Sequence, residues 1–190
     1  MPTNFPKARL ALPSGLVFEG RGFGATGNGL AVTAEVVFNT AMVGYQEALT
    51  DPSYTGQILV MTPTMVGNYG TNPEDVESRK VQVSGFVIRE LSRNVSNYRA
   101  TKDLDTYLRE CNVLGICDID TRALTRQLRT SGVVQGVLTD RTDLTDVQLI
   151  DMARKAPSMA GQNLVPLVGC SSGQTWGETL GEWSLGEQLP

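Results

Sequence analysis

The chain has 190 residues, of which 41% are hydrophobic and 19% charged, and its net charge is −4 with a pI near 4.9. This composition excludes intrinsic disorder, which requires low hydrophobicity together with high net charge. The negative charge argues against nucleic acid or an anionic membrane surface as a partner. The longest apolar runs have only four residues, too short to span a membrane, and no signal peptide is visible, so we expect a cytoplasmic protein.

The sequence contains no histidine. Any mechanism in which this chain supplies an imidazole as general base, proton carrier or metal ligand is therefore excluded. The three cysteines, Cys111, Cys117 and Cys170, form no Cys-x-x-Cys pair. A disulfide framework or a zinc site is accordingly not expected, and we predict free, buried thiols.

The first 90 residues are dominated by strand signals. Short apolar or β-branched runs alternate there with turn residues, for example at 13–15, where Pro-Ser-Gly favours a hairpin. The predicted strands are 8–12, 16–19, 30–40, 57–62, 81–88, 113–117 and 133–138. The last two lie between predicted helices. This order indicates mixed α/β layers without the regular alternation of a doubly wound sheet.

Three helices are predicted in the second half of the chain. The first follows Thr101, the second begins at the N-cap Asp120 and stops at Gly132, and the third runs from Asp143 to Pro157. The positions expected to face the core are Leu104, Tyr107, Leu108 and Cys111, then Ala123, Leu124 and Leu128, and finally Leu144, Val147, Ile150 and Ala153.

The composition changes after residue 157. The segment 158–190 is rich in glycine, contains three glutamates and no basic residue, and carries Trp176 and Trp183. Large aromatic rings normally need a surface to bury against. We therefore predict a domain over 1–157, followed by a segment that folds back on it or leads into another domain.

The segment 22–27, GFGATG, matches the GxGxxG pattern of dinucleotide-binding sites. Such a site requires a helix to open directly after the glycines, so that its N-terminus faces the pyrophosphate. An Asn-Gly turn and a run of strand formers follow instead. A glycine-rich turn is the better interpretation, and we do not expect nicotinamide-dependent chemistry.

Arg122, Arg126 and Arg129 lie at helical spacing on one face of the second predicted helix, with no acidic residue between them. Like charges at this spacing repel each other by a few tenths of a kcal/mol. Two interpretations remain open: a solvated face whose charges pair with Asp118 or Asp120, and a docking face for an acidic partner.

Ser53 lies in the segment 50–54, TDPSY. Pro52 fixes its own φ and biases Asp51 to an extended conformation, so Ser53 is held on a stiff turn. Without an imidazole it is a poor nucleophile. Its hydroxyl either bonds to its own backbone or binds an amide or oxyanion of a ligand.

Five segments together resemble the N-terminal half of the carbamoyl-phosphate synthetase small subunit, in that family's order and spacing. They are EVVFNT at 35–40, GYQE at 44–47, TDPSY at 50–54, GNYGTN at 67–72 and DIDTRALTR at 118–126. The segment WSL at 183–185 resembles the family's exit from this domain. The resemblance implies a swivelling β/β/α layered α/β domain, with mixed sheets and helices on one side.

The same resemblance implies a function. The family's small subunit hydrolyses L-glutamine and passes ammonia to a large synthetase subunit, which uses ATP and Mg to make carbamoyl phosphate for arginine and pyrimidine biosynthesis. Its Cys-His-Glu catalytic set belongs to a second, glutaminase domain, so we expect this chain to be inactive alone and to hold no cofactor or metal. Ser53 is expected to contribute to glutamine binding. Arg122 and Arg126 become candidates for contact with the large subunit in a heterodimer.

One alternative of another class stays open at this point. The chain could be a free-standing, non-catalytic interaction module that docks a partner through its arginine face and its tryptophan-bearing segment. Co-purification with the large subunit distinguishes the two, because a generic module has no reason to select that protein.

Overall fold

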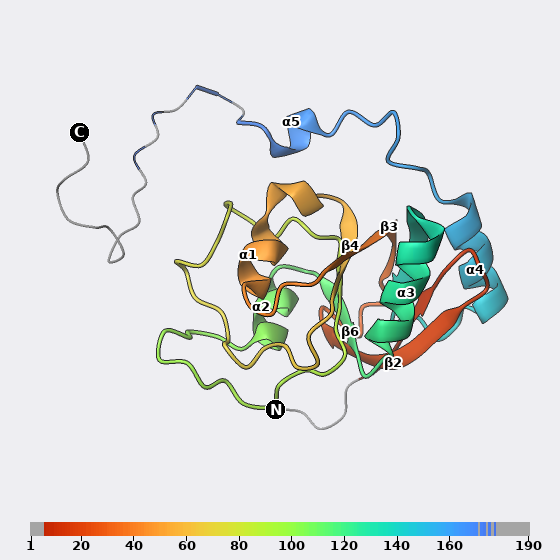
Figure 1. Cartoon of the computed structure of the whole chain (residues 1–190), viewed down its shortest axis with the longest axis horizontal. Helices are drawn as coiled ribbons and strands as arrows, with labels where there is room; N and C mark the ends of the chain where they lie inside the picture. The colour runs from red at the N-terminus through yellow and green to blue at the C-terminus, as the bar shows by residue number, and fades with distance from the viewer. Residues whose placement is uncertain (1–5, 171, 174, 176, 178–190) are drawn as a thin grey trace.

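Seven strands of the protein form one closed barrel, in a computed structural model that describes residues 6–170, 172, 173, 175 and 177 (Figure 1). The strands are β1 (Lys7–Ala11), β2 (Val17–Gly24), β3 (Ala31–Asn39), β4 (Gln57–Met61), β5 (Gly85–Val87), β6 (Leu114–Cys117) and β7 (Val134–Thr139). Their order around the barrel is β1-β2-β6-β5-β4-β3-β7. The barrel closes because β7 pairs antiparallel with both β1 and β3.

The middle of the sheet is parallel and buried on both faces. β3, β4, β5 and β6 run parallel to one another, whereas β3 pairs antiparallel with β7 and β6 with β2. Along β4, Ile58 and Val60 join one core cluster while Leu59 and Met61 join another. Because neither face of β4 meets water, its sequence is a continuous apolar run rather than an alternating one.

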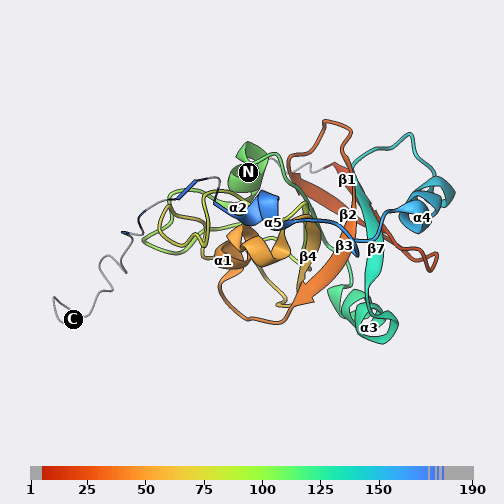
Figure 2. The same ribbon diagram turned by 90° about the horizontal axis from the view of Figure 1, so that it is seen from above.

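The helices lie on two sides of this barrel, not on one as expected. They are α1 (Tyr45–Thr50), the 3-10 helix η1 (Pro52–Tyr54), α2 (Leu104–Glu110), α3 (Thr121–Ser131), α4 (Asp146–Lys155) and α5 (Val165–Val168). Figures 1 and 2 show α1 and α2 on one side of the barrel and α3 and α4 on the other. The mixed α/β class is confirmed. The sheet closes into a seven-stranded barrel with helices on both flanks, and the swivelling β/β/α layering stays a prediction.

Capping residues set where each helix begins and ends. The position of the helix start in turn decides which side chains face the core. α3 begins after the N-cap Asp120 and ends at Gly132, as predicted. α4 begins later than predicted, because Thr145 and Gln148 form a capping box. As a result Leu149 is buried, whereas Val147, predicted to face the core, is 75% exposed. Two further positions predicted to face the core, Ala123 and Cys111, are exposed.

Two other elements differ from the prediction. The six-residue helix α1 was not expected, and the strand expected at 81–88 is only three residues long. β2 extends beyond residue 19 to Gly24, so the first two glycines of the GxGxxG pattern lie inside a strand. No helix opens after Gly27; the chain turns and enters β3, as the strand formers there predicted.

Two glycines of β2, Gly20 and Gly24, are required by close packing against β6 and the residue before it. A Cβ on Gly20 would lie 2.1 Å from the carbonyl oxygen of Cys117, and one on Gly24 would lie 2.5 Å from that of Val113. Both distances are far below any normal contact. Within the pattern at 22–27, packing explains Gly24 and a left-handed φ of 82° explains Gly27.

None of the three cysteines forms a disulfide with a described residue, and of the three only Cys117 is buried. The prediction of buried thiols was wrong for Cys111, which caps the C-terminus of α2, and for Cys170. Burial raises the pKa of Cys117 to about 12. Burial also raises the pKa of Cys111.

We therefore expect thiol reagents at pH 8 to label Cys111 and Cys170 in the folded protein, and Cys117 only after unfolding. Because the folded state favours the neutral Cys117 thiol, its contribution to stability is present below pH 9 and is lost as the pH rises toward 12. Mass spectrometry of alkylated peptides measures each rate. Equal labelling of Cys117 and Cys111 in the folded protein would contradict the burial of β6.

Trp176 and Trp183 lie outside the described residues, and the boundary between 157 and 158 stays a prediction. Among the described residues there is no helix long and apolar enough to cross a membrane. The same part of the chain holds no cluster of three or more potential metal ligands.

Candidate functional site

Ser53 lies in the single turn of η1, with its backbone held on both sides. The Asp51 carboxylate accepts a hydrogen bond from the Ser53 amide at 2.8 Å, and the Asp51 carbonyl accepts one from Tyr54. The side chain of Ser53 is exposed, and its hydroxyl makes no hydrogen bond within the described part of the chain. The turn thus fixes the backbone while leaving the hydroxyl available to a ligand.

Four of the five segments quoted above meet around α1. Asn39 at the end of β3 donates a hydrogen bond to the Tyr54 hydroxyl, at 3.0 Å. Tyr45 of α1 donates to the carbonyl of Gly70, at 2.6 Å. These contacts join 35–40 to 50–54, and 44–47 to 67–72.

Gln46 further stabilises the contact between the segments 44–47 and 67–72. Its amide nitrogen donates to the carbonyl of Asn72 at 2.5 Å, and its amide oxygen accepts from the Asn72 backbone N–H at 2.9 Å. Gln46 is 2% exposed. A buried side-chain amide that satisfies both backbone groups of one residue holds that loop in a single position, because breaking either bond leaves a buried polar group unpaired.

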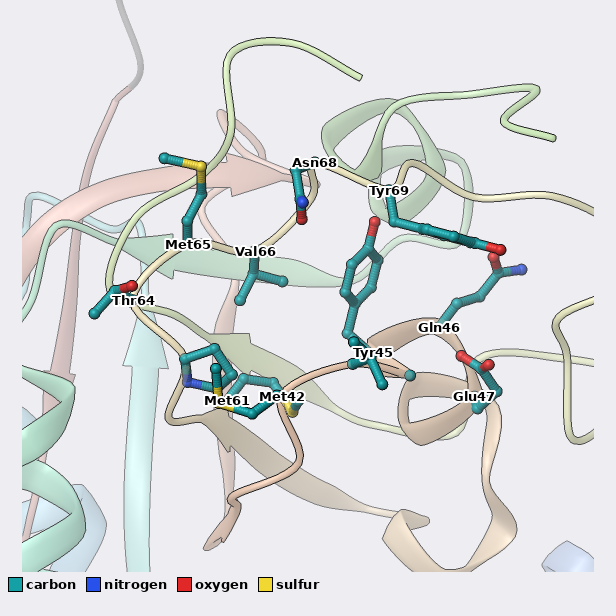
Figure 3. A pocket seen from close by; sticks show the side chains of 13 residues that line it. Met42, Tyr45, Gln46, Glu47, Met61, Thr64, Met65, Val66, Asn68 and Tyr69 are labelled. Atoms are coloured by element: carbon teal, nitrogen blue, oxygen red, sulfur yellow. The ribbon is translucent and has the colours of Figure 1, made fainter. Parts of the chain in front are cut away.

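A pocket of about 420 Å³ opens where these segments meet. Its walls come from the start of α1, the loop before it, and the segment after β4. Figure 3 shows Met42 and Met61 toward one end of the pocket and Glu47 and Tyr69 toward the other, with Tyr45 between them. The lining residues are Met42–Glu47, Met61, Pro63–Val66, Asn68 and Tyr69.

The pocket is an apolar mouth with one carboxylate. Met42 and Val43 are 78% and 79% exposed, and Met65 also faces solvent. Glu47 lies half-buried in the first turn of α1, and burial raises the pKa of its carboxyl group. Burial likewise raises the pKa of the Tyr45 hydroxyl, in keeping with its role as a neutral hydrogen-bond donor.

The predicted site residues do not all come together. Ser53 follows the C-terminal end of α1, whereas the pocket is built on the N-terminal end of that helix, and Ser53 is not among its lining residues. Arg122 and Arg126 lie on α3, on the other side of the barrel. The predicted residues therefore lie on separate surfaces of the protein and do not form a single site.

Arg122, Arg126 and Arg129 form no ion pair with any described residue. Asp118 pairs with Arg21 instead, and the Asp120 carboxylate caps α3 by accepting from Ala123 at 2.9 Å. The interpretation in which these arginines are neutralised by Asp118 or Asp120 is wrong. The helix keeps an exposed, unpaired cationic face.

Sequence reasoning did not find the residues that build the pocket. Tyr45 and Gln46 act through partners about 26 positions away, and no local pattern reveals such a pairing. The one available signal is the pair Met42 and Val43, two apolar residues beside the turn residue Gly44, whose φ of 81° is left-handed. Exposed apolar residues beside a turn indicate a surface that something else covers.

Comparison with known proteins places these features in a family. Residues 10–138 match the family model described as "Carbamoyl-phosphate synthase small chain, CPSase domain". Among solved structures, an aminopeptidase from Aneurinibacillus sp. strain AM-1 aligns with a TM-score of 0.41 and 18% identity, over 72% of this chain and 31% of that one. A likeness at that level does not inform the fold.

The curated relatives carry the same family name. The carbamoyl phosphate synthase small chain of Syntrophotalea carbinolica is 50% identical over 95% of this chain and 46% of its own length. That of Akkermansia muciniphila is 51% identical, over 86% and 42%, and the chloroplastic small chain of Oryza sativa subsp. japonica is 44% identical, over 97% and 41%. The chain thus spans about half the length of the curated relatives it matches. It belongs to the family of the carbamoyl-phosphate synthase small chain and corresponds to the CPSase domain of that family.

Proposed function

We propose that the chain is the accessory half of the small subunit of glutamine-hydrolysing carbamoyl-phosphate synthetase. In this role it completes the glutamine site and docks on the large synthetase subunit, so that ammonia from L-glutamine reaches the ATP- and Mg-dependent synthesis of carbamoyl phosphate. Arginine and pyrimidine biosynthesis consume this product. We place the assembly, a heterodimer, in the cytoplasm.

The observation that carries the proposal is the free hydroxyl of Ser53. Its backbone is fixed by Asp51 and Pro52, so little conformational entropy is lost when the hydroxyl binds a ligand. A hydroxyl both donates and accepts hydrogen bonds, and it therefore suits the polar groups of a free amino acid. With no histidine in the chain, Ser53 acts by binding, and a glutaminase half supplies the nucleophile and the base.

The exposed apolar residues near α1 support the same assignment. Met42, Val43 and Met65 lie at the mouth of the pocket and are 48–79% exposed. Surfaces of this kind in an assembled protein are covered by another unit. We assign the covering unit to the glutaminase half, which the additional length of the relatives accommodates.

Replacing Ser53→Ala in a complete small chain that carries this sequence is expected to raise the KM for glutamine. A lost hydrogen bond of about 0.5–1.5 kcal/mol corresponds to a roughly 2- to 12-fold increase in KM. If the hydroxyl also supports the oxyanion, kcat falls by about 100-fold. Steady-state glutaminase kinetics measure both constants.

The matched control is Ser14→Ala, because Ser14 is also an exposed turn serine, in the hairpin between β1 and β2. That variant should leave KM and kcat unchanged. Unchanged constants in the Ser53→Ala variant would remove Ser53 from the glutamine site.

A further inference from the structure

The cations of this protein fall into two groups, paired and unpaired. All sixteen lysines and arginines lie in the described part of the chain, and eight of them form ion pairs. Arg154 donates to the carbonyl of Pro13. The cations with no such partner are Arg79 and Lys80, which are neighbours in sequence, and five arginines: Arg89, Arg93, Arg122, Arg126 and Arg129. We call these five the arginine surface.

Two residues of the arginine surface line a groove at the N-terminal end of α3. Arg89 and Arg93 face it together with Arg21, Asp118 and Asp120. The Asp118 amide donates to the Arg89 carbonyl at 2.7 Å, which fixes the loop that carries Arg89 beside the turn from β6 into α3.

The carboxylates of the groove are mostly engaged already. Asp118 has a left-handed φ of 64° and pairs with Arg21, while Asp120 caps α3. Aspartate tolerates the left-handed conformation better than most residues, and here it aims the carboxylate at Arg21. Glu90 forms no ion pair with any described residue. The groove thus holds three guanidinium groups and three carboxylates, and two of the guanidinium groups, those of Arg89 and Arg93, form no ion pair with a described residue.

The other three arginines lie on α3, which begins directly after Asp120 of the groove. Arg122 lies two positions after Asp120, and Arg126 and Arg129 follow at intervals of four and three on the same face. Their positions span about 10 Å at the helical rise of 1.5 Å per residue. Leu124 and Leu128 face the core, and no acidic residue lies within α3. No described residue forms an ion pair with these neighbours, so nothing in that part of the chain relieves their mutual repulsion.

We infer that the arginine surface is a docking site for an acidic, carboxylate-bearing surface of another protein, and that this protein is the large synthetase subunit. The partner identity rests on the proposed function. Guanidinium groups bind carboxylates in a two-pronged, geometrically defined way, so several of them specify orientation as well as attraction. Charge complementarity of this kind mainly raises association rates.

A protein fits this surface better than a nucleic acid does. The chain carries a net charge of −4, and the groove itself contains Glu90, Asp118 and Asp120. A phosphate backbone would be repelled by these carboxylates, whereas a protein surface can place cations against them and carboxylates against the arginines.

Charge reversal with a matched control tests the inference. In a complete small chain carrying this sequence, Arg122→Glu with Arg126→Glu changes the net charge by −4, and so does Arg79→Glu with Lys80→Glu, at exposed positions outside the arginine surface. A third variant reverses Arg89 and Arg93. Association with the large subunit is followed by stopped-flow or biolayer interferometry at two or more salt concentrations.

We expect the first and third variants to associate about tenfold more slowly at low salt, with a flatter salt dependence, while the control variant stays within about twofold of wild type. Circular dichroism checks that each variant is folded. Equal slowing in all three variants would overturn the inference, because it would show an effect of net charge alone. Wild-type rates in the arginine variants would also overturn it.

Two further outcomes separate the inference from the proposed function. If the wild-type small chain does not bind the large subunit, the proposed function and the partner identity fail together. If it binds equally well with and without the arginines, while a duplex DNA or RNA probe binds only when they are present, the arginine surface serves nucleic acid and the inference is overturned.

Discussion

Replacing Phe86→Ala is expected to lower the free energy of unfolding by about 3–5 kcal/mol, the range for removing a fully buried aromatic side chain. Phe86 is fully buried in β5. Its ring packs edge-to-face on Phe23 of β2, with centroids 6.4 Å apart and planes at 70°. β5 and β2 are not neighbours in the sheet, so this contact ties strands together across a face of the barrel.

The same cluster holds Leu49 of α1 and Leu104 of α2. The cavity left by Phe86→Ala would therefore loosen both helices, including α1, whose first turn lines the pocket. Urea denaturation followed by circular dichroism measures the change. Tyr98→Ala is the control, because Tyr98 is 91% exposed and its loss should cost less than about 0.5 kcal/mol. A loss below about 1 kcal/mol for Phe86→Ala would contradict this packing.

Replacing Gln46→Leu is expected to cost about 2–4 kcal/mol although leucine is apolar and of similar size. The substitution leaves the N–H and the C=O of Asn72 buried without partners, and each such group costs about 1–3 kcal/mol. The loss should be concentrated in the segment 67–72, which forms one side of the pocket. Hydrogen exchange of the Asn72 amide should accelerate more than that of amides in β4.

Gln127→Leu provides the control for this substitution. Gln127 lies on α3, and its amide donates only to the exposed Ser131 hydroxyl, at 2.8 Å. We expect that variant to change stability by less than about 0.5 kcal/mol. Similar effects of the two substitutions would show that the bonds from Gln46 to Asn72 do not hold the loop.

Local chemistry predicted the elements whose ends are set locally. Asp120 and Gly132 define α3 because an aspartate accepts from the helix's free N–H groups and a glycine ends the helix. The capping box of Thr145 and Gln148 was also present in the sequence. Overlooking it shifted the predicted start of α4 and placed Val147 in the core.

Closure of the barrel could not be predicted in the same way. It depends on β7 pairing with β1, for example Leu138 with Leu10, across more than a hundred residues. The close approach of Gly20 to Cys117 is equally non-local. Short glycine-containing strands give no periodic signal for such pairings. The sequence at 22–27 alone therefore fits both a glycine-rich turn and a dinucleotide-binding loop.

In the candidate site, too, residues with partners close in sequence were predicted and residues with distant partners were not. Ser53 was identified by turn chemistry together with the resemblance, because Asp51 and Pro52 lie beside it in sequence. The clamp between Gln46 and Asn72 was not, because its partners are separated by 26 residues. The sequence also does not reveal that Arg122 and Arg126 form no ion pair with a described residue. This follows from the pairing of Asp118 with Arg21, which lies 97 residues away.

The central proposal is that this domain works as part of a larger synthetase. Size-exclusion chromatography tests it directly, with the 190-residue chain mixed at micromolar concentrations with the large synthetase subunit of the same organism. We predict that the two chains elute together as a stable complex. Separate elution at every concentration, with the chain folded by circular dichroism, would contradict the account.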